Sequence, residues 1–294
     1  MLTYRWTVDR TDLAELLAHR LDGYQAQTVV ILGEGQENVA YEVNSEIVVR
    51  ISKQADPAAV VDREARLLEI VGRVSTLPIP GPLFAADGVL AYRKLIGTPL
   101  LDLPTDRRRR HAVRIGGVLG GFLAEIQSIA VDLVMDLVPA DNDPLAEWMA
   151  DARQSFAEAG HHLPARHRPQ VETFLNTDPA AEPLPELVFS HNDLGIEHVL
   201  VDAAGAAVTG IIDFSDAALV DPAYDFALIL RDLGPGAFDA AAQTAQKTGD
   251  RDFRARALLY ARCSVLEDLQ YGLATDHPAY VDKSLVSLDW LFAG

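Results

Sequence analysis

The feature that most constrains the fold is a pair of short apolar segments, residues 198–202 and 208–213, separated by Ala203-Ala204-Gly205. Apolar segments of this length on either side of a Gly-bearing turn predict a β-hairpin. Antiparallel pairing would bring His198, at the start of the first strand, close to Asp213, at the end of the second. Two polar side chains that are distant in sequence would therefore meet at one end of the hairpin.

A second carboxylate, Asp193, precedes His198 by five residues in the polar run Ser190-His191-Asn192-Asp193. A carboxylate can orient a hydroxyl nucleophile and accept its proton, while imidazole and carboxylate groups can hold the Mg²⁺ that accompanies nucleotide phosphates. The layout predicts a phosphoryl-transfer site with Asp193 as the catalytic residue and His198 and Asp213 as metal ligands. The alternatives are a turn aspartate, a structural histidine and a strand-end carboxylate.

The first third of the chain is predicted to be rich in β-strands, and the rest mainly helical. Expected strands, separated by Gly and Pro turns, follow an opening helix at residues 11–21, and lie at residues 28–32, 38–44, 46–52 and 90–95. Gly97-Thr98-Pro99 is expected to mark a hinge, and a long helix should start near Thr105 with Val118 on its apolar face. Another helix should open at Asp221, as the N-cap, with Asp225 one turn further in as a brace for the polar loop.

Glu64 interrupts the apolar stripe of a helix expected over residues 57–71. A buried carboxylate is costly unless a cation meets it, so the pattern predicts a charge partner from the neighbouring sheet. Arg50 and Lys53 are the candidates.

The composition limits the class of partner. The chain has 294 residues with 25 basic and 43 acidic side chains, giving a net charge of −18. Such a surface repels nucleic acid and anionic membranes and can attract cationic small molecules, although it can also serve solubility alone. The single cysteine, Cys263, and the lack of an apolar signal segment or membrane-spanning run lead us to expect a cytoplasmic protein.

Several motifs of this sequence, in the same order along the chain, resemble those of the aminoglycoside phosphotransferase family. The members of this family are antibiotic kinases with a protein-kinase-like fold. The catalytic and metal-binding signatures of the family are similar to His191-Asn192-Asp193 with His198 and to Ile212-Asp213-Phe214. Further landmarks match residues 33–38, Glu64, 77–82 and 92–100. Most members carry asparagine at the position of His198, whereas aminoglycoside 2″-phosphotransferases and macrolide 2′-phosphotransferases resemble this chain in carrying histidine.

The resemblance implies an α+β, two-lobe fold: an antiparallel-sheet lobe with one key helix at residues 1–96, which binds nucleotide, and a larger, mostly helical lobe at residues 97–294, which carries catalysis and acceptor binding. Arg50 takes the place of the family's phosphate-contacting lysine, and strand alternation favours it over Lys53. The other positions implied to contact nucleotide are Gly33, Gly35, Glu64, Tyr92, Lys94 and Leu95. Acidic positions that could bind a cationic acceptor, or simply form a solvated helix face, are Asp232, Glu267 and Asp268.

The implied activity is transfer of the γ-phosphate of ATP or GTP, with Mg²⁺, to a hydroxyl of a small molecule. The acidic charge balance favours a polycationic aminoglycoside as the acceptor. A macrolide, or an amino alcohol or sugar of metabolism, is the alternative acceptor, since this fold serves several substrates. A nucleotide-binding regulator that has lost catalysis is the alternative of a different class.

Overall fold

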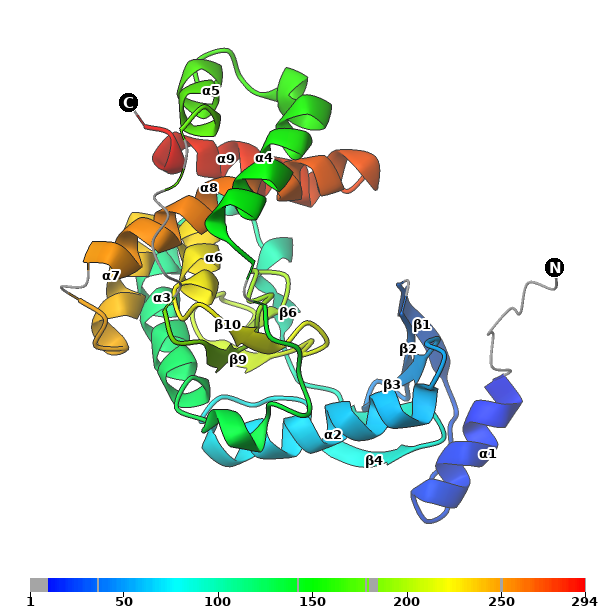
Figure 1. Ribbon diagram of the computed structural model, residues 1–294. Helices are drawn as coiled ribbons and strands as arrows, with labels where there is room; N and C mark the ends of the chain where they lie inside the picture. Colours follow the sequence, from blue (N-terminus) through cyan, green and yellow to red (C-terminus); the bar gives the residue numbers. More distant parts are fainter. Residues whose placement is uncertain are drawn as a thin grey trace. The chain divides into compact units, whose positions relative to one another are not determined.

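The structure, a computed structural model, describes residues 10–35, 37–141, 143–177, 179, 185–248 and 251–293 (Figure 1). The chain divides into two compact units. The N-terminal unit contains the residues up to Arg73 together with Ile79–Leu95, and the C-terminal unit contains Val74–Pro78 and the chain from Ile96 onward.

An antiparallel five-stranded sheet forms the framework of the N-terminal unit, with the strand order β1-β2-β3-β5-β4. The strands expected from the sequence are present, and β4, which follows the Pro-rich break, was not expected. The helices and strands of this unit are α1 (Arg10–Arg20), β1 (Val29–Glu34), β2 (Asn38–Val43), β3 (Ile47–Ser52), α2 (Pro57–Val74), β4 (Pro82–Ala86) and β5 (Val89–Arg93). Gln36, in the expected turn between β1 and β2, lies outside the described residues.

Each face of the sheet has a helix against it, which explains why β3 is buried along most of its length. Leu13 and Leu17 of α1 share a core with Val49 and the residues that alternate with it on β2 and β3. On the opposite face of β3, Arg50 pairs with Glu64 of α2. The expected charge partner of Glu64 is thus confirmed, and it is Arg50.

Helices dominate the C-terminal unit (Figure 1). The longer ones are α3 (Thr105–Ile126), α4 (Leu145–Ala159), α5 (Arg168–Leu175), α6 (Tyr224–Leu233), α7 (Pro235–Thr244), α8 (Arg251–Ala274) and α9 (Pro278–Leu291). Short 3₁₀ helices occur at Leu100–Asp102, Val131–Leu133 and Gly160–His162. The helix expected near Thr105 is confirmed, but Val118 is 37% exposed, so its placement on the buried face was wrong.

Gly116 and Gly120 allow α3 to pack closely against α7. A Cβ added at either position would lie 2.3 Å from a backbone oxygen, that of Ala237 or Ala241. Only glycine fits such a close contact. The two glycines lie about one helical turn apart, on the same face of α3. This packing holds α7 and the preceding α6 in place, and α6 carries residues that contact the candidate site.

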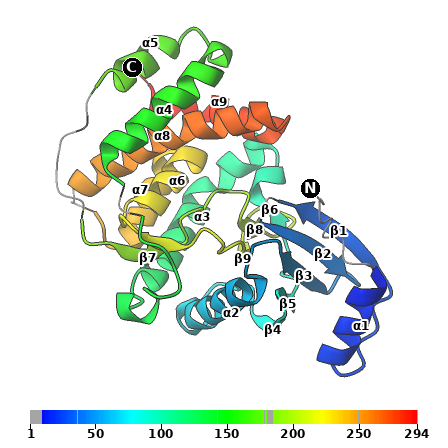
Figure 2. The same ribbon diagram turned by 45° about the vertical axis from the view of Figure 1, so that its right-hand side comes forward.

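Short strands connect the helices of this unit (Figure 2). They are β6 (Thr98–Pro99), β7 (Val188–Ser190), β8 (Val199–Val201), β9 (Val208–Ile211) and β10 (Ala218–Val220). The predicted hairpin is confirmed as β8 and β9, and β6 pairs with β8 on its other side. The expected hinge residues 98–99 are therefore part of this sheet. Within the described residues, no helix has both the length and the apolar character needed to cross a lipid bilayer.

Candidate active site

The β8–β9 hairpin brings His198 and Asp213 together as the sequence predicts. Val199 is paired with Ile211 in the antiparallel register, and the Ile212 N–H donates a hydrogen bond to the His198 carbonyl (3.0 Å). His198 and Asp213 thus flank the same end of the hairpin. Their side chains face each other, with 3.9 Å between His198 Nε2 and Asp213 Oδ2.

Asp193 lies on the other side of the same imidazole. His198 Nδ1 is 2.8 Å from the Asp193 backbone oxygen and 3.4 Å from its carboxylate Oδ2. A backbone carbonyl only accepts hydrogen bonds, so Nδ1 carries the proton and donates it. When the ring is neutral, the proton is on Nδ1 and the lone pair of Nε2 points toward Asp213. A ring that binds a metal through Nε2 needs this tautomer.

The polar loop before Asp193 is held by Asp225 of α6. The Asp225 Oδ2 atom accepts hydrogen bonds from Ser190 Oγ (2.6 Å), His191 N (2.8 Å) and Asn192 N (3.2 Å). Asp225 is fully buried, which raises the pKa of its carboxyl, while these hydrogen bonds act in the opposite direction. The predicted role of Asp225 as a brace is consistent with this geometry.

Asp221 does not cap α6 as expected. The helix starts at Tyr224 with Ala223 as its N-cap, because Pro222 and Ala223 form a turn before it. The Asp221 carboxylate instead accepts a hydrogen bond from Ala223 N (2.8 Å) and pairs with Arg256 of α8 (2.6 Å). Asp221 therefore attaches the turn before α6 to α8, and it does not cap the end of α6.

Two residues of the site have left-handed backbone conformations. Asn192, immediately before Asp193, has φ of 64°, and Asp213 has φ of 65°. Residues with a Cβ pay about 1–2 kcal/mol for such a conformation, and Asn and Asp tolerate it best. Such conformations concentrate at functional sites, where they aim a side chain that regular structure would direct elsewhere.

A neutral histidine ties the loop to the end of β9. His191 is fully buried, and burial lowers its pKa to about 4. Its Nε2 lies 3.0 Å from the Ile212 carbonyl and therefore donates a hydrogen bond to the residue preceding Asp213. The ring also packs against Phe214, with 4.6 Å between the centroids. The two sequence motifs, one ending at Asp193 and one around Asp213, are thus joined by direct contacts.

Burial and neighbouring charges shift the pKa values of Asp193 and His198 in the same direction. Burial raises the pKa of the Asp193 carboxyl to about 7, with the charge of His198 opposing the shift. Burial lowers the pKa of His198, but the charges of Asp193, Asp213 and Glu197 outweigh it and leave the pKa above its ordinary value. The Asp193 carboxyl therefore changes charge near neutrality, which suits proton transfer.

The donors at this site fit a Mg²⁺ ion only in part. Asp213 supplies carboxylate oxygen and His198 supplies Nε2, but in the described part of the chain no three His, Cys, Asp or Glu side chains are arranged to enclose a metal. Mg²⁺ usually binds one or two protein groups and completes its shell with water and substrate phosphates. His198 and Asp213 match that open kind of site.

A buried network of charged side chains packs against residues 195–198. Lys283 of α9 contacts Glu197 (3.0 Å), Asp232 (3.5 Å) and Asp268 (2.9 Å). Arg231 pairs with Asp232 (2.8 Å) and Asp268 (3.0 Å). Asp232 Oδ2 also accepts a hydrogen bond from Ile196 N (3.2 Å). The loop that carries His198 therefore rests on side chains from α6, α8 and α9.

This network contradicts the interpretation of Asp232 as an acceptor-binding residue, and also its alternative, a solvated helix face. The Asp232 side chain is only 2% exposed and its oxygens are engaged by Arg231, Lys283 and the Ile196 N–H. Asp268, 14% exposed, is likewise paired with internal cations. The Glu267 side chain reaches solvent on α8 beside Asp268, while the protein around it excludes part of the water, and this partial desolvation, followed by the charge of Asp268, raises its pKa. Of the three, Glu267 alone is available to an acceptor.

The residues expected to contact nucleotide all belong to the N-terminal unit. Arg50 Nη1 is 2.5 Å from Glu64 Oε1, and both side chains are 12% exposed. Lys53, in contrast, contacts Glu34 Oε1 and the Gly35 carbonyl, each at 2.8 Å, at the turn between β1 and β2. An added Cβ at Gly33 meets no described atom within 4 Å, so crowding does not require glycine there.

The segment expected to offer a backbone edge to the nucleobase leaves the sheet at its end. Tyr92 lies within β5, paired in register with Val48 on one side and Pro82 on the other. The Lys94 N–H donates to the Glu46 carbonyl (2.8 Å), and its Nζ contacts Glu42. Leu95, half-buried, follows the strand as the last residue of this unit.

Sequence reasoning missed Glu197, Arg231 and Lys283. A signal for Lys283 was present, because it lies four and eight residues before Ser287 and Leu291, on the buried stripe of α9. The same argument that identified Glu64 would have identified it. Glu197 gave no such signal, since it lies in a loop, where no helix or strand periodicity marks a buried position.

Solved structures share this fold over nearly the whole chain. The GDP and kanamycin complex of an APH(2″) is 22% identical, covering 95% of this chain and 98% of that chain, with a TM-score of 0.68. The streptomycin-ATP-APH(2″)-IIa ternary complex is 18% identical, covering 97% of each chain, with a TM-score of 0.61. The macrolide 2′-phosphotransferase MphH from Brachybacterium faecium is 20% identical, covering 96% and 98%, with a TM-score of 0.62.

The expected fold class is confirmed by these likenesses and by the sheet and helical units of the structure. A family model described as the phosphotransferase enzyme family (APH) matches residues 28–259. This span includes Arg50, Glu64 and the whole Asp193, His198 and Asp213 cluster. The chain therefore belongs to the APH phosphotransferase enzyme family.

Proposed function

We propose that this protein transfers the γ-phosphate of ATP or GTP to a hydroxyl of a small-molecule antibiotic, with an aminoglycoside as the first candidate. The observation that carries the proposal is the convergence of Asp193, His198 and Asp213, with His198 Nδ1 at 3.4 Å from one carboxylate and Nε2 at 3.9 Å from the other. Phosphoryl transfer depends on positioning and on charge stabilisation, and this cluster supplies groups for both.

Asp193 acts on the acceptor. Its carboxylate accepts a hydrogen bond from the acceptor hydroxyl, orients the oxygen for attack and takes its proton as the new bond to phosphorus forms. Asp225 holds the loop before Asp193, and His198 Nδ1 holds its backbone oxygen. These contacts limit the motion of the carboxylate, and position is the main requirement for this step.

His198 Nε2 and Asp213 would hold Mg²⁺. When bound, the ion neutralises charge on the nucleotide phosphates. The backbone at Asp213 and the hydrogen bond from Ile212 N to the His198 carbonyl fix the two ligands relative to each other. In the N-terminal unit, Arg50 would clamp phosphate oxygens, with Glu64 setting the orientation of its guanidinium.

A cationic acceptor is supported by charge. The chain carries a net charge of −18, and Glu267 presents an exposed carboxylate on α8. A macrolide is the second candidate, favoured by the likeness to MphH over 96% of this chain. We also propose that the protein acts in the cytoplasm without nucleic-acid or membrane partners, an inference supported by the acidic charge and the single, buried, free Cys263.

The test is an assay of nucleoside-diphosphate release, with ATP and GTP as donors and with kanamycin, a macrolide and simple amino alcohols as acceptors. Asp193→Asn should lower kcat by about 10²–10⁴-fold and leave nucleotide affinity nearly unchanged, because only the hydroxyl loses its partner. Asp276→Asn is the matched control, since Asp276 has a φ of 53° that asparagine tolerates.

Tight nucleotide binding without turnover for any acceptor would favour the regulator over the enzyme. Turnover of amino alcohols alone would favour a metabolic kinase. A parallel loss of nucleotide binding in Asp193→Asn would mean that the role of Asp193 is wrong.

A further inference from the structure

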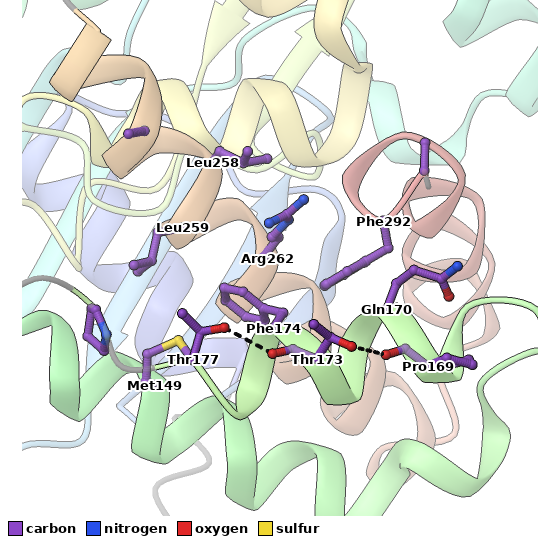
Figure 3. A pocket seen from close by; sticks show the side chains of 13 residues that line it. Met149, Pro169, Gln170, Thr173, Phe174, Thr177, Leu258, Leu259, Arg262 and Phe292 are labelled. Atoms are coloured by element: carbon purple, nitrogen blue, oxygen red, sulfur yellow. Dashed lines mark hydrogen bonds between the residues drawn. The ribbon is translucent and has the colours of Figure 1, made fainter.

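A cavity of about 650 Å³ lies in the C-terminal unit between α4, α5, α8 and the residues after α9 (Figure 3). Its volume is within the range of small-molecule sites. Apolar side chains form most of its wall, among them Met149, Phe174, Leu258, Leu259 and Phe292. Asp193, His198 and Asp213 are not part of its lining, so the cavity is separate from the candidate active site.

Arg262 is the charged residue among the described residues that line this cavity. Figure 3 shows its side chain among Leu258, Phe174 and Phe292. The guanidinium carbon lies 5.5 Å from the centroid of the Phe174 ring and 5.2 Å from that of Phe292. Its Nε donates a hydrogen bond to the Leu291 carbonyl (2.8 Å), which fixes the plane of the group. The two rings and this hydrogen bond therefore hold the guanidinium in one orientation.

The charge of Arg262 has no protein counter-ion in the ranges that the structure describes. No carboxylate there forms an ion pair with it, and neither Nη atom has a hydrogen-bond acceptor. Two other arginines of α8 differ, since Arg254 pairs with Asp239 (2.5 Å) and Arg256 pairs with Asp221 (2.6 Å).

A guanidinium in an apolar wall binds a carboxylate more strongly than one in water, because less water competes for its N–H groups. Burial lowers the pKa of Arg262, which agrees with this loss of hydration. The hydroxyls on the rim are engaged locally, since Thr173 and Thr177 donate to the Pro169 and Thr173 carbonyls. The cavity thus offers one cationic group and a large apolar surface.

From this arrangement we propose that the cavity is a second ligand site that binds a small organic acid with an apolar, ring-sized body and a single carboxylate. The carboxylate would accept hydrogen bonds from the two Nη groups of Arg262. The body would lie against Met149, Leu258 and Leu259, where it removes apolar surface from water. The site is independent of the proposed phosphoryl transfer.

The proposal is tested by isothermal titration calorimetry with 1-naphthaleneacetate and with its uncharged isostere 1-naphthaleneacetamide. The acid should bind at least about ten-fold more tightly than the amide, since a charge-assisted hydrogen bond is worth more than a neutral one. Arg262→Met should remove that preference while retaining weak binding of both compounds. Arg254→Met, on the same helix but with its own carboxylate partner, should leave the preference unchanged.

Leu259→Trp should abolish binding of both compounds, because the larger side chain fills the cavity. A crystal structure of the unaltered protein with the acid gives a test that does not depend on how the variants fold, and the carboxylate should lie within hydrogen-bonding distance of Arg262. Equal affinities for acid and amide, or an acid bound elsewhere, would overturn the proposal. Neither result bears on the nucleoside-diphosphate assay, so the two proposals fail separately.

Discussion

The two units bury charge in different ways. In the N-terminal unit, one cation and one carboxylate, Arg50 and Glu64, join a strand to a helix, and each side chain is 12% exposed. In the C-terminal unit, Arg231 and Lys283 are shared among the carboxylates of Asp232, Asp268 and Glu197. The second arrangement connects three helices with the loop that carries His198.

The two arrangements serve different purposes: the N-terminal pair orients one side chain, whereas the C-terminal network supports a loop. A pair fixes the direction of one guanidinium, and losing either member removes that constraint. A network with more carboxylates than cations depends on every cation, because removing one leaves several buried negative charges without compensation. We therefore expect the C-terminal network to be the more sensitive of the two.

The largest effect is expected from Lys283→Met. The change leaves Glu197, Asp232 and Asp268 with one cation instead of two, so the free energy of unfolding should fall by about 3–5 kcal/mol in urea denaturation. Lys247→Met, at a half-buried position outside the network, is the control. A loss below about 1 kcal/mol would show that the network adds little stability.

A smaller effect is expected from Glu64→Gln in the N-terminal pair. Gln keeps the size but not the charge, so the hydrogen bond to Arg50 weakens and the free energy of unfolding should fall by about 1.5–3 kcal/mol. The KM for nucleotide should rise if Arg50 contacts phosphate. Glu69→Gln, exposed on the same helix, should alter neither quantity.

Acid should weaken the network progressively. The Asp232 pKa is lowered from 3.8 despite its burial, chiefly by Arg231 and Lys283, and that of Glu197 is lowered from 4.5 mainly by Lys283. Such groups stabilise the fold fully above their unfolded-state pKa values, and the contribution is lost as the pH falls through the folded-state values. Stability should therefore decline below about pH 4.5. Asp232→Asn should show a shallower decline over that range, and an unchanged slope would contradict this account.

The smallest effect on stability is expected from Lys53→Met. Its contact Glu34 is 61% exposed, and an ion pair of this kind contributes about 0–1 kcal/mol. The same variant distinguishes the two candidates for phosphate contact when it is compared with Arg50→Met. Nucleotide affinity, measured by calorimetry, should fall in Arg50→Met and persist in Lys53→Met. The reverse result would assign the contact to Lys53.

Local sequence patterns predicted much of the fold and the centre of the site. The hairpin could be predicted from local sequence, since two apolar segments and a Gly-bearing turn fix which residues pair. Glu64 could be assigned a cation because a carboxylate on an apolar stripe requires one. The N-cap of α6 was expected at Asp221, two residues before its observed position at Ala223, since an Asp-Pro pair fits a turn before a helix as well as the helix start itself.

The sequence by itself determined that Asp193, His198 and Asp213 would converge, because residues within about twenty positions of each other are joined by one loop and one hairpin. Only the tertiary structure decided what supports them. Lys283 reaches Glu197 across 86 positions, and whether a carboxylate such as Asp232 faces solvent or a buried cation depends on how distant helices pack. No local pattern records that packing, since it depends on surfaces that separate parts of the chain contribute.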